Sequence, residues 1–360
     1  MRVALISLEP WDEVWRRNQH LSVELVAKGL AEHVLFVEPP LLTAARGSVR
    51  EVNEGVTAIR PSLRVPKRLG GLALAGALLR STVLRNVDVL WINDAVLGVR
   101  CLDPAVPALY DVTDDWREFD FPARILRRLV RAEDRLARTV GTVVCGTVLQ
   151  QRWRERYGVS AVVVHNGVDA DLWKRAVPRG LPGAAPHVGY VGTLHEERLD
   201  VDLVLRVADD PRIGRVHLVG PDALGAAARE RLLAHPHVEL HGAVSAEQVP
   251  SWTKAMDVLV SPHLVTPFTL SLDAIKSYEY LSSGRPVVAT PTSGFQLLTA
   301  GSLSLASPAD FPDRVAAAAG AALPDPELSE HSWASRARQF GALLEAAVSG
   351  RDTRGRDVHV

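Results

Sequence analysis

Lys276 and Glu279, a cation and a carboxylate three residues apart, follow a strand-like run and precede a glycine turn. The pattern over residues 258–290 predicts a strand, a loop, a helix from about Leu272, a turn and another strand. That helix would begin at the carboxyl end of the preceding strand, where its free N–H groups favour a diphosphate. Glu279, about two turns into the helix, could then accept hydrogen bonds from two ribose hydroxyls.

The elements around this segment alternate between short β-branched runs and helical stretches. In the first half the expected strands are Val3–Ser7, Val34–Val37, Val87–Ile92, Ala108–Asp111, Thr142–Cys145 and Ala161–Val164. In the second half they are Val188–Gly192, Val216–Gly220, Val238–Leu240, Val258–Val260, Pro286–Thr290 and Ser304–Ala306. Such alternation predicts parallel sheets with crossover helices, and therefore an α/β fold.

The 360 residues favour two domains, separated by a segment at 178–186 with three prolines and two glycines. We expect an N-terminal domain over residues 1–177 and a C-terminal domain over 178–332. Residues 333–360 would form a helix, about Trp333 to Val348, that packs back toward the N-terminal domain and ends in a frayed tail. Ligands in such sheets bind at the carboxyl ends of the strands, so we expect two Rossmann-like domains to face each other across a cleft.

Composition excludes several classes of protein. The formal net charge is −1, which gives no global reason to bind nucleic acid. The two cysteines, Cys101 and Cys145, are too few for a disulfide scaffold and indicate a reducing compartment. No G-x-x-x-x-G-K-[ST] motif occurs, the turn after the first strand lacks G-x-G-x-x-G, and no tight cluster of metal ligands is visible. We therefore expect no metal and no prosthetic group.

The chain resembles GT-B glycosyltransferases, particularly the family 4-like retaining enzymes, and within them a bacterial branch for cell-surface polysaccharides and natural products. Besides residues 257–290, the resemblance rests on five motifs that occur in the family's order: Pro10–Asp12 with Arg16–Leu21, Val34–Pro40, Tyr110–Trp116, Asn166–Asp169 and Gly189–Leu194. One such motif would be weak, whereas several in order are specific.

The resemblance implies transfer of a sugar from a UDP-, GDP- or dTDP-sugar to an acceptor hydroxyl, a hexosyltransferase-like activity (EC 2.4). The acceptor would be a polysaccharide, a lipid-linked sugar or a natural product, held largely by the N-terminal domain, whereas the C-terminal domain would hold the nucleotide. Glu279 matches the family's ribose-binding glutamate, and Arg198 falls where the family places a cation on the diphosphate. Their alternatives are a solvated helix glutamate and a surface ion pair. The expected donor-binding residues are Gly192, Thr193, Arg198, His263, Ser271, Lys276 and Glu279.

Two donor-side positions depart from the family pattern, and a histidine that many relatives place near the reacting sugar is absent. Ser271 stands where a second glutamate usually contacts the donor sugar, and Asp273 could compensate only if its loop shifts. Thr193 replaces an arginine that usually follows Gly192, so Lys276 is the substitute diphosphate cation. These departures leave room for two alternatives: a nucleotide-sugar epimerase or hydrolase on the same fold, or a non-catalytic sugar-nucleotide-binding partner of another transferase.

Polar residues after the N-terminal strands are the candidates for the acceptor side. We expect Asp12, Gln19, His20 and Asp111 to line it, although Gln19 and His20 could instead cap a helix. The residues expected to act in catalysis are Arg198, Lys276, Asp114 and Asp115. Retention, in which the leaving phosphate helps deprotonate the acceptor, is the expected course, whereas inversion would require a base among Asp12, His20, Asp114 and Asp115.

The N-terminus reaches acidic residues before any cleavable apolar region, so we expect a cytoplasmic protein. An arginine stripe at helical spacing offers a possible weak contact with the inner face of a membrane, and a solvated helix face is its alternative. The stripe consists of Arg124, Arg128, Arg131, Arg135 and Arg138. The oligomeric state stays open.

Overall fold

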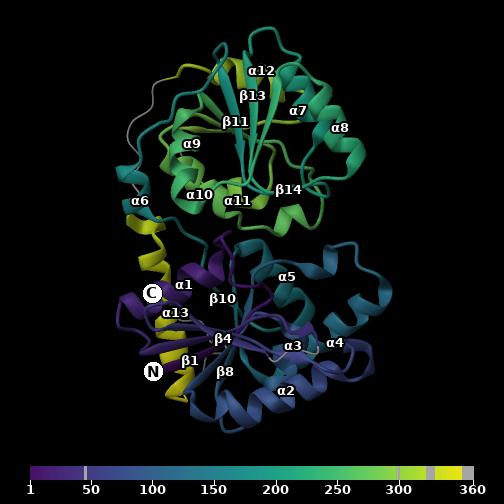
Figure 1. Ribbon diagram of the computed structural model, residues 1–360, viewed down its shortest axis with the longest axis vertical. Helices are drawn as coiled ribbons and strands as arrows, with labels where there is room; N and C mark the ends of the chain where they lie inside the picture. Colours follow the sequence, from purple (N-terminus) through teal and green to yellow (C-terminus); the bar gives the residue numbers. More distant parts are fainter. Residues whose placement is uncertain (44–46, 297, 299–300, 322–328, 351–360) are drawn as a thin grey trace. The chain divides into compact units, whose positions relative to one another are not determined.

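The computed structural model describes residues 1–43, 47–296, 298, 301–321 and 329–350 (Figure 1). The chain divides into two compact units: unit 1 comprises Met1–His165 with Trp333–Val360, and unit 2 comprises Asn166–Ser332. Most of the tail that we expected to fray, residues 351–360, lies outside the described residues.

The first boundary lies after His165, twelve residues before the Pro-rich segment where we expected it. The reason is local bonding. The Asn166 amide donates to Asp273 Oδ2 at 2.6 Å, and Trp173 packs with Val168 and Tyr278. These contacts tie residues 166–177 to unit 2.

Unit 1 is built on an eight-stranded sheet in the order β10-β9-β8-β7-β1-β2-β5-β4, in which only β4 runs antiparallel to its neighbour. The strands are β1 (Arg2–Ile6), β2 (His33–Val37), β4 (Ser48–Asn53), β5 (Val56–Arg60), β7 (Val89–Ile92), β8 (Ala108–Val112), β9 (Gly141–Val144) and β10 (Val162–Val163), with a separate pair β3 (Leu41–Leu42) and β6 (Ser62–Leu63). The chain reverses its direction of sheet growth between β1 and β7, which makes this pair the switch point of unit 1.

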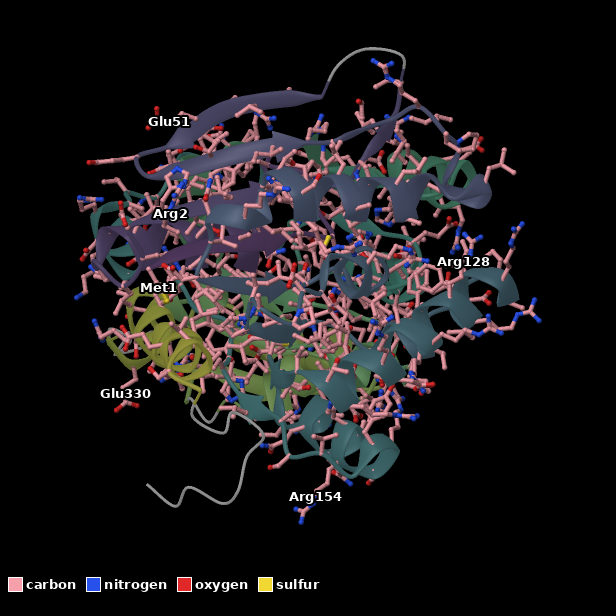
Figure 2. The ribbon with its side chains drawn as sticks, turned by 90° about the horizontal axis from the view of Figure 1, so that it is seen from below. Met1, Arg2, Glu51, Arg128, Arg154 and Glu330 are labelled. Atoms are coloured by element: carbon pink, nitrogen blue, oxygen red, sulfur yellow. The ribbon has the colours of Figure 1, made fainter. Side chains whose placement is uncertain are left out.

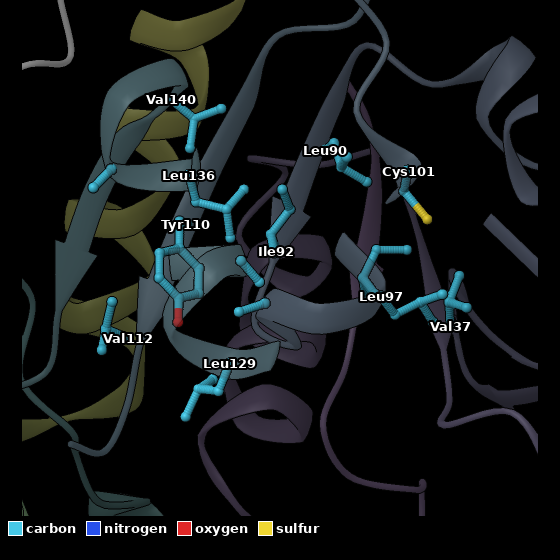
Figure 3. Packing of buried hydrophobic residues seen from close by; sticks show 14 of the residues in the cluster. Val37, Leu90, Ile92, Leu97, Cys101, Tyr110, Val112, Leu129, Leu136 and Val140 are labelled. Carbon is cyan, nitrogen blue, oxygen red and sulfur yellow. The ribbon is translucent and has the colours of Figure 1, made fainter. Parts of the chain in front are cut away.

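Helices cover both faces of this sheet. They are α1 (Arg17–Ala27), α2 (Gly71–Thr82), α3 (Ala95–Cys101), α4 (Ala123–Thr139), α5 (Thr147–Tyr157) and α13 (Trp333–Val348), with short 3₁₀ turns η1 (Lys67–Leu69), η2 (Leu84–Asn86) and η3 (Trp116–Glu118). One face packs α2, α3, α4 and α5 into the core shown in Figure 3, where Ile92 and Tyr110 meet Leu136 of α4. On the other face α13 contacts α1, β7 and β8. Both cysteines are buried and neither forms a disulfide, as hydrophobic packing predicts.

Unit 2 is built on a six-stranded sheet in the order β15-β13-β11-β16-β17-β18, whose pairings are all parallel. The strands are β11 (His187–Val191), β13 (Arg215–Val219), β15 (Val238–Gly242), β16 (Val258–Ser261), β17 (Val287–Ala289) and β18 (Leu303–Leu305), with a small pair β12 (Leu194–His195) and β14 (Asp222–Ala223). Its switch point is the pair β11 and β16, since the sheet grows outward from each in opposite directions.

The helices of unit 2 divide between two faces of its sheet. They are α6 (Ala170–Arg175), α7 (Val201–Ala208), α8 (Ala226–Ala234), α9 (Val249–Ala255), α10 (Ile275–Ser282), α11 (Ser293–Gln296) and α12 (Phe311–Ala318), with 3₁₀ turns η4 (Ala246–Gln248), η5 (Thr269–Ser271) and η6 (Ser329–His331). Residues of α7, α8 and α12 share one apolar core with the sheet, and Trp252 of α9, Tyr280 of α10 and Phe295 of α11 share the other. The predicted α/β class with two Rossmann-like domains is therefore confirmed.

Two local expectations differ from the structure. The hairpin of β4 and β5 was not expected, because its strands carry polar and charged residues on a partly exposed sheet edge. The helix expected from Leu272 begins at Ile275, after the 3₁₀ turn η5. Glu279 is consequently the fifth residue of α10, just over one turn from its start.

Candidate functional site

Several buried ionisable side chains lie together at the switch point of unit 2, where β11 and β16 end. Tyr190 and Gly192 come from the end of β11, His263 follows β16, and α10 carries Lys276 and Glu279. Parallel strands end at the same edge of a sheet, so the topology brings these residues together without any contribution from unit 1. Open α/β sheets bind ligands at this position.

Gly192 permits a lysine to lie against the backbone. Its φ of 141° is in the region that favours glycine, and a Cβ at this position would lie 2.9 Å from Lys276 Nζ. A side chain at residue 192 would therefore compete with the ammonium for the same space. The glycine predicted from the motif is explained by this close approach.

Lys276 is the centre of a polar cluster. Its Nζ donates to the Tyr190 hydroxyl, lies 3.8 Å from the centre of the Tyr190 ring and is 3.5 Å from His263 Nε2. The Tyr190 hydroxyl donates to the Thr193 carbonyl at 3.0 Å and lies 3.2 Å from His263 Nε2. Burial, and then the nearby charge of Arg198, lowers the pKa of Lys276 to about 7.

Arg198 supplies the second cation of this region. The backbone around it is fixed by the bridge between Leu199 and His263 and by the bond from the Leu264 amide to the Arg198 carbonyl at 2.8 Å. Its guanidinium lies 5.1 Å from the Phe268 ring centre. Arg198 Nε is buried, and within the described part of the chain it has no hydrogen-bond partner. Such an unmet donor is costly in a folded protein, which makes it a functional candidate.

Glu279 lies one turn after Lys276 on α10 and is half-buried. Burial raises the pKa of its carboxyl to about 7, and the charge of Lys276 opposes that rise. The Glu279 carboxylate makes no hydrogen bond to the residues that the structure describes. The residue before α10 is Ala274, whose side chain cannot cap the helix, so the first N–H groups of α10 add to the positive character of this region.

The neighbouring loop before α10 is held by its own hydrogen bonds. Ser271, predicted to contact the donor, is fully buried and donates to the Phe268 carbonyl at 2.7 Å. Asp273 accepts from the Asn166 amide through one carboxylate oxygen and from the Tyr278 hydroxyl at 2.7 Å through the other. Asp273 therefore holds the loop in place, and a shift that let it replace the missing glutamate would break both bonds.

Two positioning residues went unrecognised in the sequence. The Tyr280 hydroxyl accepts from the Val191 amide at 2.8 Å and donates to the Val191 carbonyl at 3.1 Å, which fixes α10 to the end of β11. Thr290 Oγ1 accepts from the His263 amide at 3.1 Å and donates to its carbonyl at 2.7 Å. Both lie in predicted elements, but residue type and spacing do not distinguish them from ordinary core residues.

Ion-paired carboxylates lie on β8 and just after it, next to the switch point of unit 1. Asp111 is fully buried and bonds Arg17 through both oxygens, at 3.0 and 3.1 Å, and also accepts from Trp91 Nε1. Asp115 is buried between Arg152 and Arg156, with contacts of 2.6 to 2.9 Å. Both aspartates are engaged in holding elements of unit 1 together.

The remaining acceptor-side candidates fall into two groups. Gln19 is fully buried and accepts from the Arg16 amide at the start of α1, which is the helix-capping alternative. His20 stacks on Trp333 at 4.7 Å, and burial lowers its pKa to about 3. Asp12 and Asp114 are less buried: Asp12 pairs with Arg16 at 3.0 Å, and Asp114 accepts from the Thr113 hydroxyl at 3.3 Å.

A hydrogen-bonded pair of asparagines at the same switch point was not predicted. Asn18 Nδ2 donates to Asn93 Oδ1 at 2.8 Å and to Ser7 Oγ at 3.1 Å. Asn93 Nδ2 donates onward to the Asp111 carbonyl at 3.2 Å. Asn18 lies in a motif that we identified, but only the pairing of β1 with β7 shows that it meets Asn93.

The expectation that no metal-ligand cluster exists needs correction. Among the described residues His217, Glu239 and His241 each place one ligand atom within 4.8 Å of the others. His217 comes from β13, whereas Glu239 and His241 come from β15, and only the folded sheet makes the two strands neighbours.

Comparison with known proteins shows what unit 2 and the whole chain are similar to. Residues 185–325 match the family described as Glycosyl transferases group 1. A relative is the putative teichuronic acid biosynthesis glycosyltransferase TuaH of Bacillus subtilis (strain 168), 24% identical over 200 residues, which are 51% of this chain and 50% of TuaH. The chain thus matches only about half the length of this curated relative.

Solved glycosyltransferases share the fold over nearly the whole chain. Sucrose-phosphate synthase from Thermosynechococcus elongatus has a TM-score of 0.67 at 19% identity, covering 97% of this chain and 96% of that one. Anabaena HepE, solved with UDP and glucose, has a TM-score of 0.62 at 17% identity over the same shares. The fold is that of GT-B glycosyltransferases, and the resemblance to them that the motifs predicted is confirmed. None of the described helices has the length and apolar character needed to cross a membrane.

Proposed function

We propose that this chain is a glycosyltransferase that moves a sugar from a nucleoside diphosphate sugar to an acceptor hydroxyl, a hexosyltransferase-type reaction (EC 2.4). The observation that carries the proposal is the group of Arg198, Lys276 and the uncapped start of α10 at the switch point of unit 2. A diphosphate supplies the negative charge that these donors lack, and charge that grows on the leaving phosphate is what a transferase must stabilise.

In this proposal each donor-site residue has one task. Arg198 binds phosphate oxygens through its fork of N–H groups, and Lys276 provides a second charge from beside Gly192. Glu279 accepts hydrogen bonds from the ribose hydroxyls, which its free carboxylate oxygens permit. His263 and Thr193 position Tyr190 and through it Lys276. The UDP bound in HepE, which has the same fold, makes UDP the first nucleotide to test.

We further propose that the anomeric configuration is retained. Inversion needs a base near the acceptor, and two of the four groups considered are poor ones. His20 has a low pKa because it is buried, and Asp115 is committed to two arginines. Asp12 and Asp114 are then the bases that inversion would use. The product anomer, assigned by proton NMR of the first turnover, distinguishes the two courses, and an inverted product that disappears in Asp114→Asn would overturn retention.

A transfer assay separates this function from its alternatives. Purified protein is incubated with UDP-, GDP- and dTDP-sugars, with and without acceptors, and release of the nucleoside diphosphate is measured for the wild type and for Glu279→Ala. We expect acceptor-dependent release that falls at least about tenfold in the variant. Release without acceptor would indicate a hydrolase, a changed sugar without release would indicate an epimerase, and binding without turnover would indicate a non-catalytic partner.

We propose that the protein works in the cytoplasm and touches the inner face of the membrane through α4. This helix exposes Arg124, Arg127, Arg131, Arg135 and Arg138, and it also exposes Ile125. Figure 2 shows Arg128 on the same helix pointing away from the ribbon. Charge complementarity makes anionic lipid the fitting partner for this face, each arginine near the surface contributing about 1 kcal/mol.

Vesicle sedimentation tests the membrane contact. We expect binding to vesicles with phosphatidylglycerol, little binding to pure phosphatidylcholine, and loss of binding in Arg131→Glu/Arg135→Glu. The control Arg212→Glu changes an exposed arginine of unit 2 and should bind as the wild type. Equal binding to both kinds of vesicle, or none to either, would contradict the proposal.

A further inference from the structure

Three neighbouring strands of unit 2 place imidazoles on one face of the sheet. His187 begins β11, His217 is the middle residue of β13, and His241 lies near the end of β15. The register pairs Gly189 with His217 and His217 with Glu239, so the side chains of these strands alternate in step. The face is the one that α9 covers, since the His241 ring packs on Trp252 at 4.5 Å.

The ligand atoms form a triangle of the size that a metal ion requires. His217 Nδ1 lies 3.0 Å from His241 Nε2, and Glu239 Oε2 lies 3.6 Å from the first and 3.7 Å from the second. The point in their plane that is equidistant from these three atoms is about 2.0 Å from each, which is the length of zinc bonds to imidazole nitrogen and carboxylate oxygen. The other carboxylate oxygen, Glu239 Oε1, is 3.6 Å from Arg215 Nε, which leaves Oε2 turned to the imidazoles.

We propose that His217, Glu239 and His241 bind a transition metal ion of the Zn²⁺ type, with water as its fourth ligand. Two imidazoles and one carboxylate suit Zn²⁺ and its first-row neighbours, whereas Mg²⁺ and Ca²⁺ select oxygen ligands. His217 is fully buried, but the side chains of His241 and Glu239 are 20% and 29% exposed, so the ion and its water have access from solvent.

Proton positions are consistent with this site and give His187 a role. Without metal, the spacing of 3.0 Å between His217 Nδ1 and His241 Nε2 indicates that one nitrogen carries a proton. On binding, both of these nitrogens present lone pairs to the ion, and His217 carries its proton on Nε2. That N–H can donate to His187 Nδ1, which is also 3.0 Å away. His187 is thus a positioning residue that holds the ligand tautomer of His217.

The metal site is separate from the proposed donor site. His187 opens β11, whereas Tyr190 and Gly192 lie at its other end, and Tyr190 belongs to the apolar core on the opposite face of the sheet. A bound ion would link β13 to β15, which is the edge strand of this sheet. Its expected effect is to stabilise that edge against unfolding rather than to take part in transfer.

Metal titration of the whole chain tests the proposal. Protein dialysed against a chelator is titrated with Zn²⁺ by calorimetry and with Co²⁺ by visible absorption, and circular dichroism verifies folding of each variant. We expect one ion per chain and a four-coordinate Co²⁺ spectrum. His241→Ala and Glu239→Gln should each weaken binding at least about 100-fold, more than the usual loss of an outer partner. His235→Ala, a partly exposed histidine of the same unit paired with Asp209, is the matched control and should bind as the wild type.

His187 is tested through rescue. His187→Ala should weaken binding about 10–100-fold without changing the Co²⁺ spectrum, and His187→Gln, whose carbonyl can accept the same N–H, should restore it. No binding by the wild type would overturn the proposal. So would binding that persists in both His241→Ala and Glu239→Gln, or that falls equally in His235→Ala. If His241→Ala fails to fold, Glu239→Gln alone decides, because it keeps the size of the side chain.

Discussion

The two units share a topology, but buried charges near their switch points differ in whether they have partners. In unit 1 the buried charge of Asp111 is met by Arg17 through two hydrogen bonds. In unit 2 Arg198 Nε is buried without a hydrogen-bond partner among the described residues, and burial moves the pKa values of Lys276 and Glu279 toward 7 from opposite sides. The first arrangement stabilises the fold, and the second leaves donors and charges for a ligand. The same region of two similar sheets therefore need not have the same function.

The largest expected effect concerns stability in unit 1. Asp111→Ala leaves the buried Arg17 charge without its partner, so we expect the free energy of unfolding to fall by about 3–5 kcal/mol in urea titrations. Asp12→Ala breaks a half-exposed pair with Arg16 and should cost about 0–1 kcal/mol. If Asp111→Ala kept full stability but lost transfer to acceptor, Asp111 would be an acceptor-side residue, as first predicted, and the contrast between the units would fail.

The next effect concerns rate in unit 2. Arg198→Ala removes the guanidinium proposed to stabilise the leaving diphosphate, so we expect kcat to fall about 10²–10³-fold while the melting temperature changes little. Arg206→Ala removes an exposed arginine from α7 of the same unit and should leave kcat unchanged. A similar loss of rate in both variants would show that general positive charge, rather than Arg198, matters.

Nucleotide affinity should depend on pH because Lys276 and Glu279 each gain or lose a proton near pH 7. Binding favours the charged lysine, which is lost above pH 7, and the charged glutamate, which is lost below pH 7. Calorimetric affinity should therefore be greatest near pH 7. In Lys276→Met the affinity should be lower overall and rise with pH through 7, and in Glu279→Gln it should fall with pH through 7. If the affinity of either variant still fell on both sides of pH 7, these assignments would be contradicted.

The smallest effect is a gain of stability at the donor site. The pKa of Lys276 in the folded chain is about 7, below its usual 10.5, so the unfolded chain binds more protons between these values. Stability should rise with pH across this window, and Lys276→Met should remove that rise. At pH 7.5 this gain, less the lost bond to Tyr190, should raise the melting temperature of the variant by about 2–4 °C. A lower melting temperature would mean that Lys276 stabilises the fold, as Arg17 does in unit 1.

Much of the fold could be predicted because its information is local. Strands such as β11 and β16 are apolar runs between turn residues, and each begins within one residue of its predicted start. The start of α10 was displaced because a 3₁₀ turn, η5, has nearly the same local pattern as a helix. The β4 and β5 hairpin lies at a partly exposed edge and lacks the apolar run that marks a central strand.

The donor side of the candidate site was predictable from the spacing of Gly192, Lys276 and Glu279 within motifs. Long-range pairing was not. The Asp111 and Arg17 pair joins residues 94 apart, and the His217 and His241 cluster exists only because β13 and β15 are adjacent. Nor does residue type reveal that Asp273 holds Asn166, 107 residues away, rather than a ligand. These partners are set by the assembled sheet and not by any segment alone.

Thermal unfolding with nucleoside diphosphates tests the central claim most directly. The wild type, Arg198→Ala and Arg206→Ala are each melted with UDP, GDP, dTDP and ADP. A nucleotide present at 100 times its dissociation constant adds about 2.7 kcal/mol to the folded state. We expect at least one nucleotide to raise the melting temperature of the wild type and of Arg206→Ala by the same amount, and to raise that of Arg198→Ala far less. No shift with any nucleotide, or a full shift in Arg198→Ala, would contradict the account.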